Sequence, residues 1–419
     1  MRHINIPIFI PHLGCPHTCV FCNQRKISGV GCVDIGAVRE QIDATLDGIR
    51  GREGEYECEI AFFGGSFTGI PRDELTELLE LARPYVDDGR VASLRCSTRP
   101  DYIDEEIIDL LLRYRMTTVE LGVQSTSEEV LRRCERGHTA EQSMAARRMI
   151  RESGMHAIGQ MMTGLPGSTR ESDLQTGRDI IGAGADGARI YPTMTFAGTA
   201  LEGMLRRGEY TPPSAEETVE RVADLCELFS AAGVPVIRIG LCYGEGLTGD
   251  DGIVAGDYEC AVGEMAQSRV FLRRLRALLA DAGIRELGSD AGNTPAPCMT
   301  AQCMSASDAV VSDAVVSDAA ASGAAASDAV SGAAASGADA SDNNGCADSV
   351  RAGADAPTRN ERVLTVVCPR GRTSQVIGHR RANAEALRRE YGIGRLCVRE
   401  DDSLCGCELR VQSWSDWRL

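Results

Sequence analysis

Three cysteines near the amino terminus have the spacing of a metal-binding loop. Cys15, Cys19 and Cys22 form a C-x3-C-x2-C pattern directly after an apolar run. Thiolates are soft ligands that favour iron–sulfur clusters or zinc. Structural zinc normally takes four protein ligands, whereas three cysteines leave one position open for a substrate or cofactor. We therefore interpret the loop as the ligand set of an open [4Fe-4S] cluster. Zinc completed by His12 or His17, and unligated thiols, are the alternatives.

The elements that must position this loop alternate between strand-like and helix-like segments. Apolar or β-branched runs predict six strands, at Ile4–Ile10, Glu59–Phe63, Ser93–Ser97, Thr117–Val123, His156–Met162 and Ala188–Tyr191. Amphipathic stretches follow them, and further helices are expected at Ser214–Ala232 and Gly263–Ala282 with the apolar run Val234–Leu241 between. Repeated βα units favour a parallel sheet or partial barrel. We predict an α/β fold, a partial (β/α)6 TIM-like barrel.

Composition divides the chain into three parts. From Ser305 to Asp342 it uses only Ala, Ser, Asp, Val and Gly, which gives too little apolar surface to form a core. We therefore predict a core domain over 1–290, a disordered linker over 291–360 and a small C-terminal α/β domain over 361–419.

Charge and hydropathy limit the partners. Lys+Arg 44 against Asp+Glu 61 gives a net charge of −17, so contact with nucleic acid needs a local basic patch. The region from Thr358 to Leu419 offers one, with 12 arginines against 8 acidic residues. Phosphate binding there, as by RNA, and an ordinary solvated helix face are equally good interpretations. No apolar run approaches the roughly 20 residues of a membrane span, so we expect a cytoplasmic protein.

The cysteine loop, with Phe21 before its last cysteine, resembles that of the radical S-adenosylmethionine (SAM) superfamily. The resemblance implies a [4Fe-4S] cluster whose unique iron binds SAM, and reductive cleavage of SAM to a radical that abstracts hydrogen from a substrate. It also implies a reductant such as flavodoxin or ferredoxin.

Motifs after the later strands extend the resemblance to cofactor contacts. It implies that Gly64, Gly65 and Ser66 hold the methionyl end of SAM, although many members have Glu in place of Ser66. The ribose is expected near Gln124 and Ser125, and the adenine beside the Gly164–Gly167 turn. The expected cofactor-binding residues are Phe21, Gly64, Gly65, Ser66, Gln124, Ser125, Gly164, Leu165 and Pro166.

The order of these motifs resembles the radical SAM half of the Elongator catalytic subunit, a tRNA-modifying enzyme, and related bacterial proteins. It includes Ser97–Asp101, Glu120–Ser125, Arg136–His138, Gly164–Gly167 and Ile190–Pro192. The resemblance implies tRNA or another RNA as substrate, with a short C-terminal extension and no acetyltransferase domain. Two alternatives are a tetrapyrrole enzyme related to oxygen-independent coproporphyrinogen oxidase and a non-catalytic, zinc-dependent RNA-binding protein.

A second group of cysteines lies in the C-terminal region. Cys397, Cys405 and Cys407 lack a fourth ligand and a firm metal-binding spacing. We therefore expect them to be free thiols.

Overall fold

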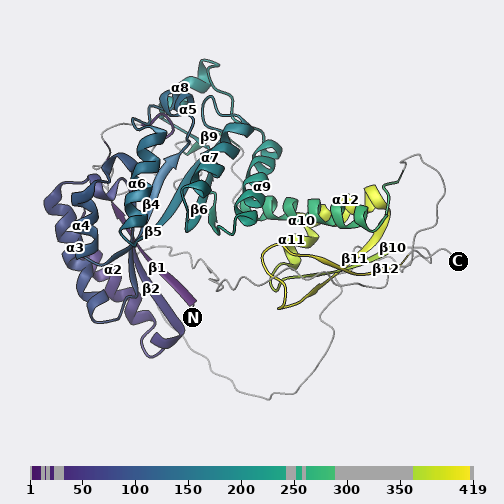
Figure 1. Cartoon of the computed structure of the whole chain (residues 1–419), viewed down its shortest axis with the longest axis horizontal. Coiled ribbons are helices and arrows are strands. Elements are labelled where there is room, and N and C mark those ends of the chain that lie inside the picture. Colours follow the sequence, from purple (N-terminus) through teal and green to yellow (C-terminus); the bar gives the residue numbers. More distant parts are fainter. Residues whose placement is uncertain are drawn as a thin grey trace, which may run out of the picture.

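Seven parallel strands form one curved sheet at the centre of the first part of the chain (Figure 1). The computed structural model describes residues 2–10, 15, 19–22, 33–241, 252–256, 261–287 and 362–415. The strand order is β1-β2-β3-β4-β5-β6-β8. These strands are β1 (Arg2–Ile10), β2 (Tyr56–Gly64), β3 (Ser93–Thr98), β4 (Met116–Gln124), β5 (His156–Thr163), β6 (Gly187–Pro192) and β8 (Val236–Ile239). The six predicted strands are confirmed, and β8 forms from the apolar run Val234–Leu241.

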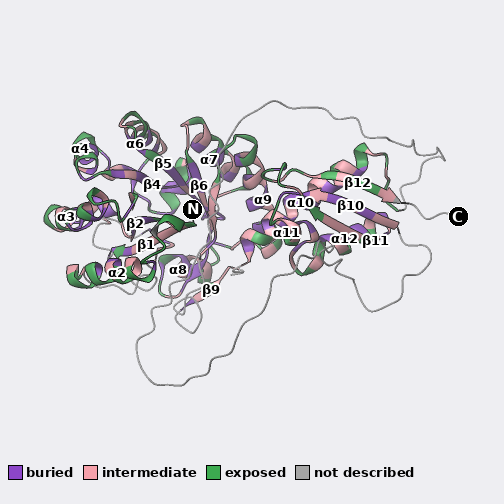
Figure 2. Ribbon diagram, turned by 90° about the horizontal axis from the view of Figure 1, so that it is seen from below, coloured by how far each residue is buried: buried purple, intermediate pink, exposed green. Residues whose placement is uncertain are grey.

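Helices cover one face of this sheet (Figure 1). The helices of this part are α2 (Ile35–Gly48), α3 (Arg72–Asp87), α4 (Glu105–Arg113), α5 (Glu128–Arg133), α6 (Ala140–Glu152), α7 (Arg170–Gly182), α8 (Ala200–Arg206), α9 (Ala215–Ala231) and α10 (Val262–Asp281). Of these, α5 and α8 lie beyond one end of the sheet, and α10 extends towards the C-terminal part (Figure 1). Alternate strand residues such as Ile60, Leu94 and Leu121 are buried against the helices. The buried strands and the exposed outer faces of the helices are distinct in Figure 2. The expected partial α/β barrel is therefore confirmed.

Polar caps fix where several helices begin. Thr139 and Thr169 accept hydrogen bonds from the first turns of α6 and α7, and both form capping boxes. Only six residues thus separate the end of β5 at Thr163 from the start of α7 at Arg170, which leaves a short loop at the carboxyl edge of the sheet. A small antiparallel pair, β7 (Thr195–Phe196) and β9 (Ile253–Ala255), lies beyond β6 in the chain.

The C-terminal part is a three-stranded sheet with two helices. Its elements are β10 (Arg362–Cys368), α11 (Thr373–Ile377), α12 (Ala382–Tyr391), β11 (Ile393–Glu400) and β12 (Arg410–Ser415), with strand order β11-β10-β12. β11 is parallel to β10 and β12 is antiparallel to it. The predicted small α/β unit is present. The predicted linker over 291–360 lies outside the described residues.

Helix α10 contributes to the core on both sides. Ala266 and Val270 pack in the cluster that includes α9 and β6 residues. On another side of the same helix, Phe271, Leu275 and Leu279 pack against β10 and α12 residues in the C-terminal core. The two parts are therefore joined through a shared helix as well as through the chain.

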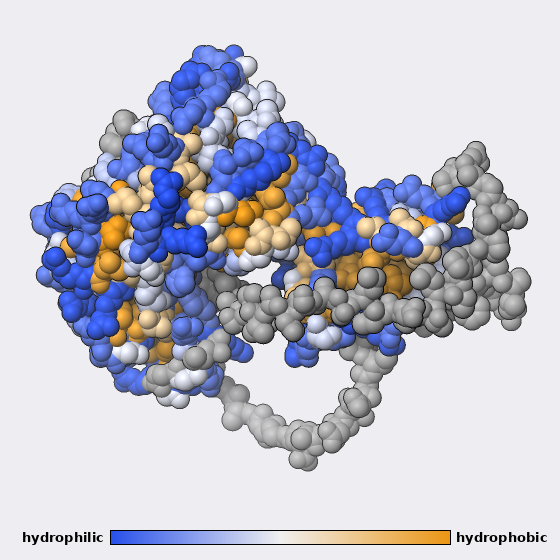
Figure 3. Space-filling view, viewed as in Figure 1, coloured by the Kyte–Doolittle hydropathy of each residue, from blue (hydrophilic) through white to orange (hydrophobic). Residues whose placement is uncertain are grey.

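The surface of the described residues is mixed. Hydrophilic residues dominate the outer helices on the face seen in Figure 3, with hydrophobic ones between them. Among the described residues, no helix has the length and apolar character needed to cross a membrane.

Candidate functional site

The predicted motifs meet at one edge of the large sheet. The cysteine loop follows β1, Gly64 ends β2, Gln124 ends β4 and Gly164 follows β5. Because all these strands are parallel, their carboxyl ends lie at the same edge, where active sites of α/β barrels are built. The structure therefore brings these predicted residues to a common rim.

Backbone hydrogen bonds hold the turn of the cysteine loop against neighbouring helices. The Val20 amide donates to the Cys134 carbonyl at 3.1 Å, and the Leu201 amide donates to the Val20 carbonyl at 2.8 Å. The Val20 side chain packs in a buried cluster with Leu165, beside Phe21. The loop is thus anchored to α5, to α8 and to the turn after β5.

The three thiols differ in environment. Cys19 is buried, whereas Cys15 and Cys22 are half-buried, and none of the three forms a disulfide. Cys15 accepts a hydrogen bond from the Ser66 backbone amide, and Cys19 accepts one from Arg136 Nη1 at 3.4 Å. Burial raises the pKa of the Cys15 thiol, and the positive charge of Arg136 opposes this rise. These soft, partly buried donors beside a cation fit a cluster with thiolate ligands.

Metal-binding geometry is not formed among the described residues, and these include Cys15, Cys19 and Cys22. Within the ranges that the structure describes, no three His, Cys, Asp or Glu side chains converge closely enough to bind an ion. Cys397, Cys405 and Cys407 are among these residues, and none of them forms a disulfide. His12 and His17, the alternative zinc ligands, lie outside the described residues.

Arg136 is a buried cation beside the cysteine loop. Its Nη2 donates to the Gly122 carbonyl at 2.7 Å, and its own carbonyl accepts from Arg99 Nη2 at 2.7 Å. Arg99 forms an ion pair with Asp101 at 2.8 Å, but Arg136 has no carboxylate partner among the described residues. Its Nε also has no hydrogen-bond partner. A buried guanidinium without a counter-charge is costly, so this position is suited to an anionic ligand.

The neighbouring His138 is uncharged. Burial, followed by the charge of Arg136, lowers the pKa of this imidazole to about 3. Its Nε2 lies 3.3 Å from the Val123 carbonyl and its Nδ1 has no partner. Sequence analysis recognised Arg136 and His138 within a motif but assigned neither to the site.

The glycine pair after β2 lies against the end of β1. Gly64 has φ 109°, and the Gly65 amide donates to the Ile10 carbonyl at 3.2 Å. The Ser66 hydroxyl is 2.8 Å from Thr98 Oγ1 and also accepts from the Arg99 amide. The side chain of Ser66 is thus engaged within the protein, while its backbone amide contacts Cys15.

Replacing Gly64 with alanine is expected to destabilise the fold by about 2 to 4 kcal/mol. An alanine Cβ would lie 2.4 Å from the Ile10 carbonyl oxygen in a backbone conformation with positive φ. Gly89→Ala is the matched control, since its φ is +79° but no atom lies within 4 Å of the added Cβ. Urea unfolding of both variants measures the effect. Equal losses for the two would show that the clash with Ile10 contributes nothing.

Gln124 and Ser125 end β4 with different roles. Gln124 is buried at φ 64°, a strained value for a residue with a side chain, and its Oε1 has no partner. Ser125 instead accepts from the Ser127 amide at 3.1 Å and lies near Thr176. Of the two predicted ribose contacts, Gln124 has the free acceptor.

The Gly164–Gly167 turn is fixed from two sides. The Tyr210 hydroxyl donates to the Gly164 carbonyl at 2.9 Å, and the Gly164 amide donates to Asp173 Oδ2 at 3.4 Å. Asp173 also pairs with Arg221 at 2.9 Å. Burial raises the pKa of Asp173 to about 6, although Arg221 opposes the rise.

The pH dependence of stability should therefore change in Asp173→Asn. Its pKa is raised from 3.8, so folded Asp173 holds a proton that the unfolded chain has lost between about pH 4 and 6. As the pH rises from about 4 to 6, the free energy of unfolding of the original chain should therefore fall by about 3 kcal/mol relative to that of Asp173→Asn. Urea unfolding of cluster-free protein at pH 4, 5, 6 and 7 measures this difference. A constant difference would mean that the pKa of Asp173 is not raised.

A row of paired charges, with buried glutamates and half-buried arginines, crosses the sheet on the face opposite the helices. Arg95 pairs with Glu59 at 2.6 Å and with Glu120 at 2.9 Å, and Arg189 pairs with Glu120 at 2.9 Å. Burial acts to raise the pKa of Glu59, but hydrogen bonds from His3 and Arg95 outweigh it and lower that pKa. Sequence analysis missed this row, although charged residues at alternate positions of apolar strands were a readable signal.

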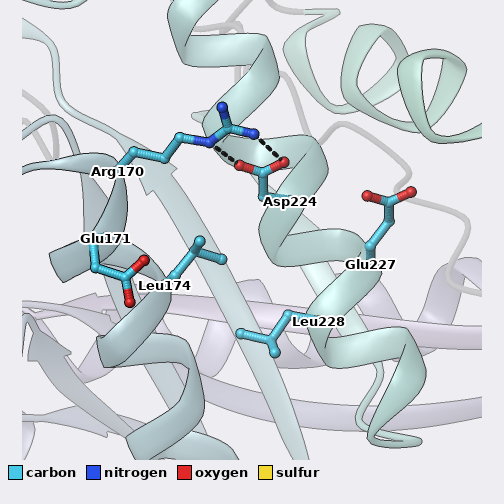
Figure 4. A pocket seen from close by; sticks show the side chains of 6 residues that line it. All are labelled: Arg170, Glu171, Leu174, Asp224, Glu227 and Leu228. Carbon is cyan, nitrogen blue, oxygen red and sulfur yellow. Dashed lines mark hydrogen bonds and ion pairs between the residues drawn. The ribbon is translucent and has the colours of Figure 1, made fainter. Parts of the chain in front are cut away.

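A groove of about 600 Å³ lies away from this rim, between α7 and α9 (Figure 4). Arg170 on α7 spans the groove, and its Nη2 donates to Asp224 Oδ1 on α9 at 2.7 Å. Leu174 and Leu228 form its apolar part. None of the predicted site residues lines it, so the groove is separate from the candidate site.

Comparison with known proteins agrees with the fold and the motifs. An uncharacterised protein of Methanocaldococcus jannaschii is 29% identical over 235 residues, covering 54% of this chain and 71% of the relative. The tRNA uridine(34) acetyltransferase of the same organism is 38% identical over 137 residues, covering 32% of this chain but only 25% of that enzyme. The solved structure of archaeal Elp3 from Methanocaldococcus infernus, with part of its N-terminus deleted, superimposes with a TM-score of 0.52 at 23% identity. It covers 65% of this chain and 64% of its own.

Two family models match successive parts of the chain. The radical SAM superfamily model covers residues 9–180, which include the cysteine loop and the rim motifs, and the Radical_SAM C-terminal domain model covers 185–271. Together they span more than half of the chain. With cysteines and glycines at the matching edge of a parallel half-barrel, the chain belongs to the radical SAM superfamily, whose members are enzymes that use a [4Fe-4S] cluster and SAM.

Proposed function

We propose that Cys15, Cys19 and Cys22 hold a [4Fe-4S] cluster, that SAM binds beside it, and that the enzyme acts on tRNA or another RNA. Three thiolates would leave one iron of the cluster without a protein ligand, and the amino and carboxylate groups of SAM would bind there. When bound, the cluster and SAM supply a 5′-deoxyadenosyl radical that abstracts hydrogen from the substrate.

The observation that carries this proposal is the buried guanidinium of Arg136, which donates to Cys19 and Gly122 but leaves its Nε without a hydrogen-bond partner. A buried cation that lacks a carboxylate partner in the described residues fits the SAM carboxylate. Gly122 and Arg99 already hold Arg136 in place through its Nη2 and its carbonyl. Its position would therefore not depend on the ligand.

Other rim residues have roles that match the remaining parts of SAM. The backbone of Gly64, Gly65 and Ser66 would hold the methionyl amine, because the Ser66 hydroxyl is already engaged. Gln124 would accept a hydrogen bond from the ribose, with Ser125 fixing the turn behind it. The turn formed by Gly164, Leu165 and Pro166, together with Phe21, would flank the adenine, since Leu165 and Phe21 share one apolar cluster.

An RNA substrate is supported by one relative. The 38% identity to a tRNA uridine(34) acetyltransferase covers 137 residues of this chain. Acetyl transfer is not part of the proposal, because most of that enzyme has no counterpart in the aligned part of this chain.

The test is anaerobic incubation of the reconstituted protein with SAM and dithionite, which replaces a flavodoxin or ferredoxin reductant. We expect a brown protein with iron and sulfide that forms 5′-deoxyadenosine, and formation that increases when unmodified tRNA transcript is added. A colourless protein with one zinc and no 5′-deoxyadenosine would overturn the enzyme. Stimulation by a tetrapyrrole and not by tRNA would overturn the RNA substrate alone.

A further inference from the structure

The C-terminal sheet has one face that the helices do not cover. Leu364, Val366 and Cys368 of β10 are fully buried against α10, α11 and α12. Figure 1 shows the three strands along one side of these helices. The alternate residues Val363, Thr365 and Val367 point the other way and are only half-buried. We define this second side as the open face.

The strand register places arginines on the open face. Val367 lies opposite Arg399 of β11 and Arg410 of β12, so both flank it in one row. Val363 lies opposite Arg395 on the same side, four residues before Val367. All three arginines are exposed. Because Leu396 and Val398 contact the core, Arg395 and Arg399 on either side of them project outward.

These charges are largely uncompensated. Arg395 and Arg399 form no ion pair or hydrogen bond within the described part of the chain, and Arg410 faces only the more distant Asp401. No Asp or Glu occupies an outward position of the described strands, since Glu400 lies opposite the inward-facing Cys368 and accepts from Thr373. In a chain of net charge −17, this is a local positive surface.

Four other arginines of the C-terminal part, Arg370, Arg372, Arg388 and Arg389, do not form one comparable surface. Arg372 donates to Gln267 and Gln375, each at 3.0 Å, and Arg370 lies 3.8 Å from Asp402. Arg388 and Arg389 are exposed, but they lie on α12, which packs against the other face of the sheet.

We infer that the open face, through Arg395, Arg399 and Arg410, binds the phosphate backbone of the RNA substrate. The inference rests on the proposed RNA substrate and adds the surface that holds it. Arginine is suited to phosphate through its planar set of donors. Thr365 and Ser413, opposite each other in the middle row, add hydroxyls between the arginines. The outward positions contain no aromatic residue on which a base could stack. The surface would therefore bind the phosphate backbone of the RNA without recognising its base sequence.

The test uses the full chain and a fluorescent, unmodified tRNA transcript. Arg395→Glu/Arg399→Glu is expected to weaken binding roughly tenfold at moderate salt, since two ion pairs are removed and two repulsions added. The slope of log K against log salt should decrease by about 0.7 for each phosphate of a single strand that the variant no longer neutralises. The matched control is Arg388→Glu/Arg389→Glu on α12, with the same change in charge, and it should bind tRNA nearly as the original chain does.

Each other outcome has a distinct meaning. Equal weakening in both double variants, or in neither, overturns the open face as the RNA surface while the RNA substrate stands. No tRNA binding by the original chain refutes the proposed RNA substrate itself, and 5′-deoxyadenosine formation without RNA reports the radical chemistry separately. If the open-face variant loses binding of a flavodoxin but keeps tRNA binding, the surface belongs to an acidic protein and the inference is wrong. Matching thermal unfolding of the variants excludes a folding defect.

Discussion

Cys19→Ser is expected to lower bound iron and 5′-deoxyadenosine formation by more than roughly 100-fold. A serine oxygen is a poor ligand for iron that prefers thiolate, and loss of a ligand should cost more than the 10- to 100-fold typical of outer-shell changes. Cys19 is the most buried of the three thiols and the one that Arg136 contacts. Iron and sulfide analysis after anaerobic reconstitution, followed by chromatography of the SAM products, gives the result.

Cys405→Ser is the control for this experiment. Cys405 is an exposed, free thiol in the C-terminal part, so the same exchange of sulfur for oxygen should leave iron content unchanged. Full iron content in Cys19→Ser, with folding intact by circular dichroism, would refute the assigned ligand set.

Arg136→Gln is expected to weaken SAM binding by roughly 30-fold or more while cluster assembly is largely retained. Truncating one partner of a buried charge pair costs about 2 to 5 kcal/mol. Glutamine keeps a donor for the Gly122 carbonyl but removes the positive charge. Titration of SAM into the reconstituted protein, followed by the change in the cluster spectrum, measures the dissociation constant.

A neighbouring arginine provides the comparison. Arg132 lies on α5, is exposed and pairs with Glu129, so Arg132→Gln should bind SAM as the original chain does. If Arg136→Gln also binds SAM normally, its guanidinium has another role, and the SAM carboxylate must have a different partner.

The large sheet could be predicted because each strand is a short apolar run between helix-like segments. Ile4–Ile10 and His156–Met162 lie within β1 and β5, which extend no more than two residues beyond them at either end. The extra strand β8 was visible as an apolar run but not assignable, since four half-buried residues give too little alternation to identify a strand.

The site could be predicted where function depends on residue type and spacing. The cysteines and glycines are such cases. By contrast, the positive φ of Gln124 and the missing counter-charge of Arg136 depend on contacts between segments far apart in the chain. Likewise, the open face required the pairing of β10 with β11 and β12, because no local pattern places Arg399 and Arg410 in one row.

The shared helix α10 limits how this protein can be divided. A cut before α10 would remove Ala266 and Val270 from beneath the half-barrel, and a cut after it would leave Phe271, Leu275 and Leu279 facing water. Either fragment would expose a stripe of apolar side chains to water and would tend to aggregate. A recombination event that exchanged the C-terminal unit would therefore give a folded protein only under one condition. The exchanged α10 would have to fit both the half-barrel and the C-terminal sheet.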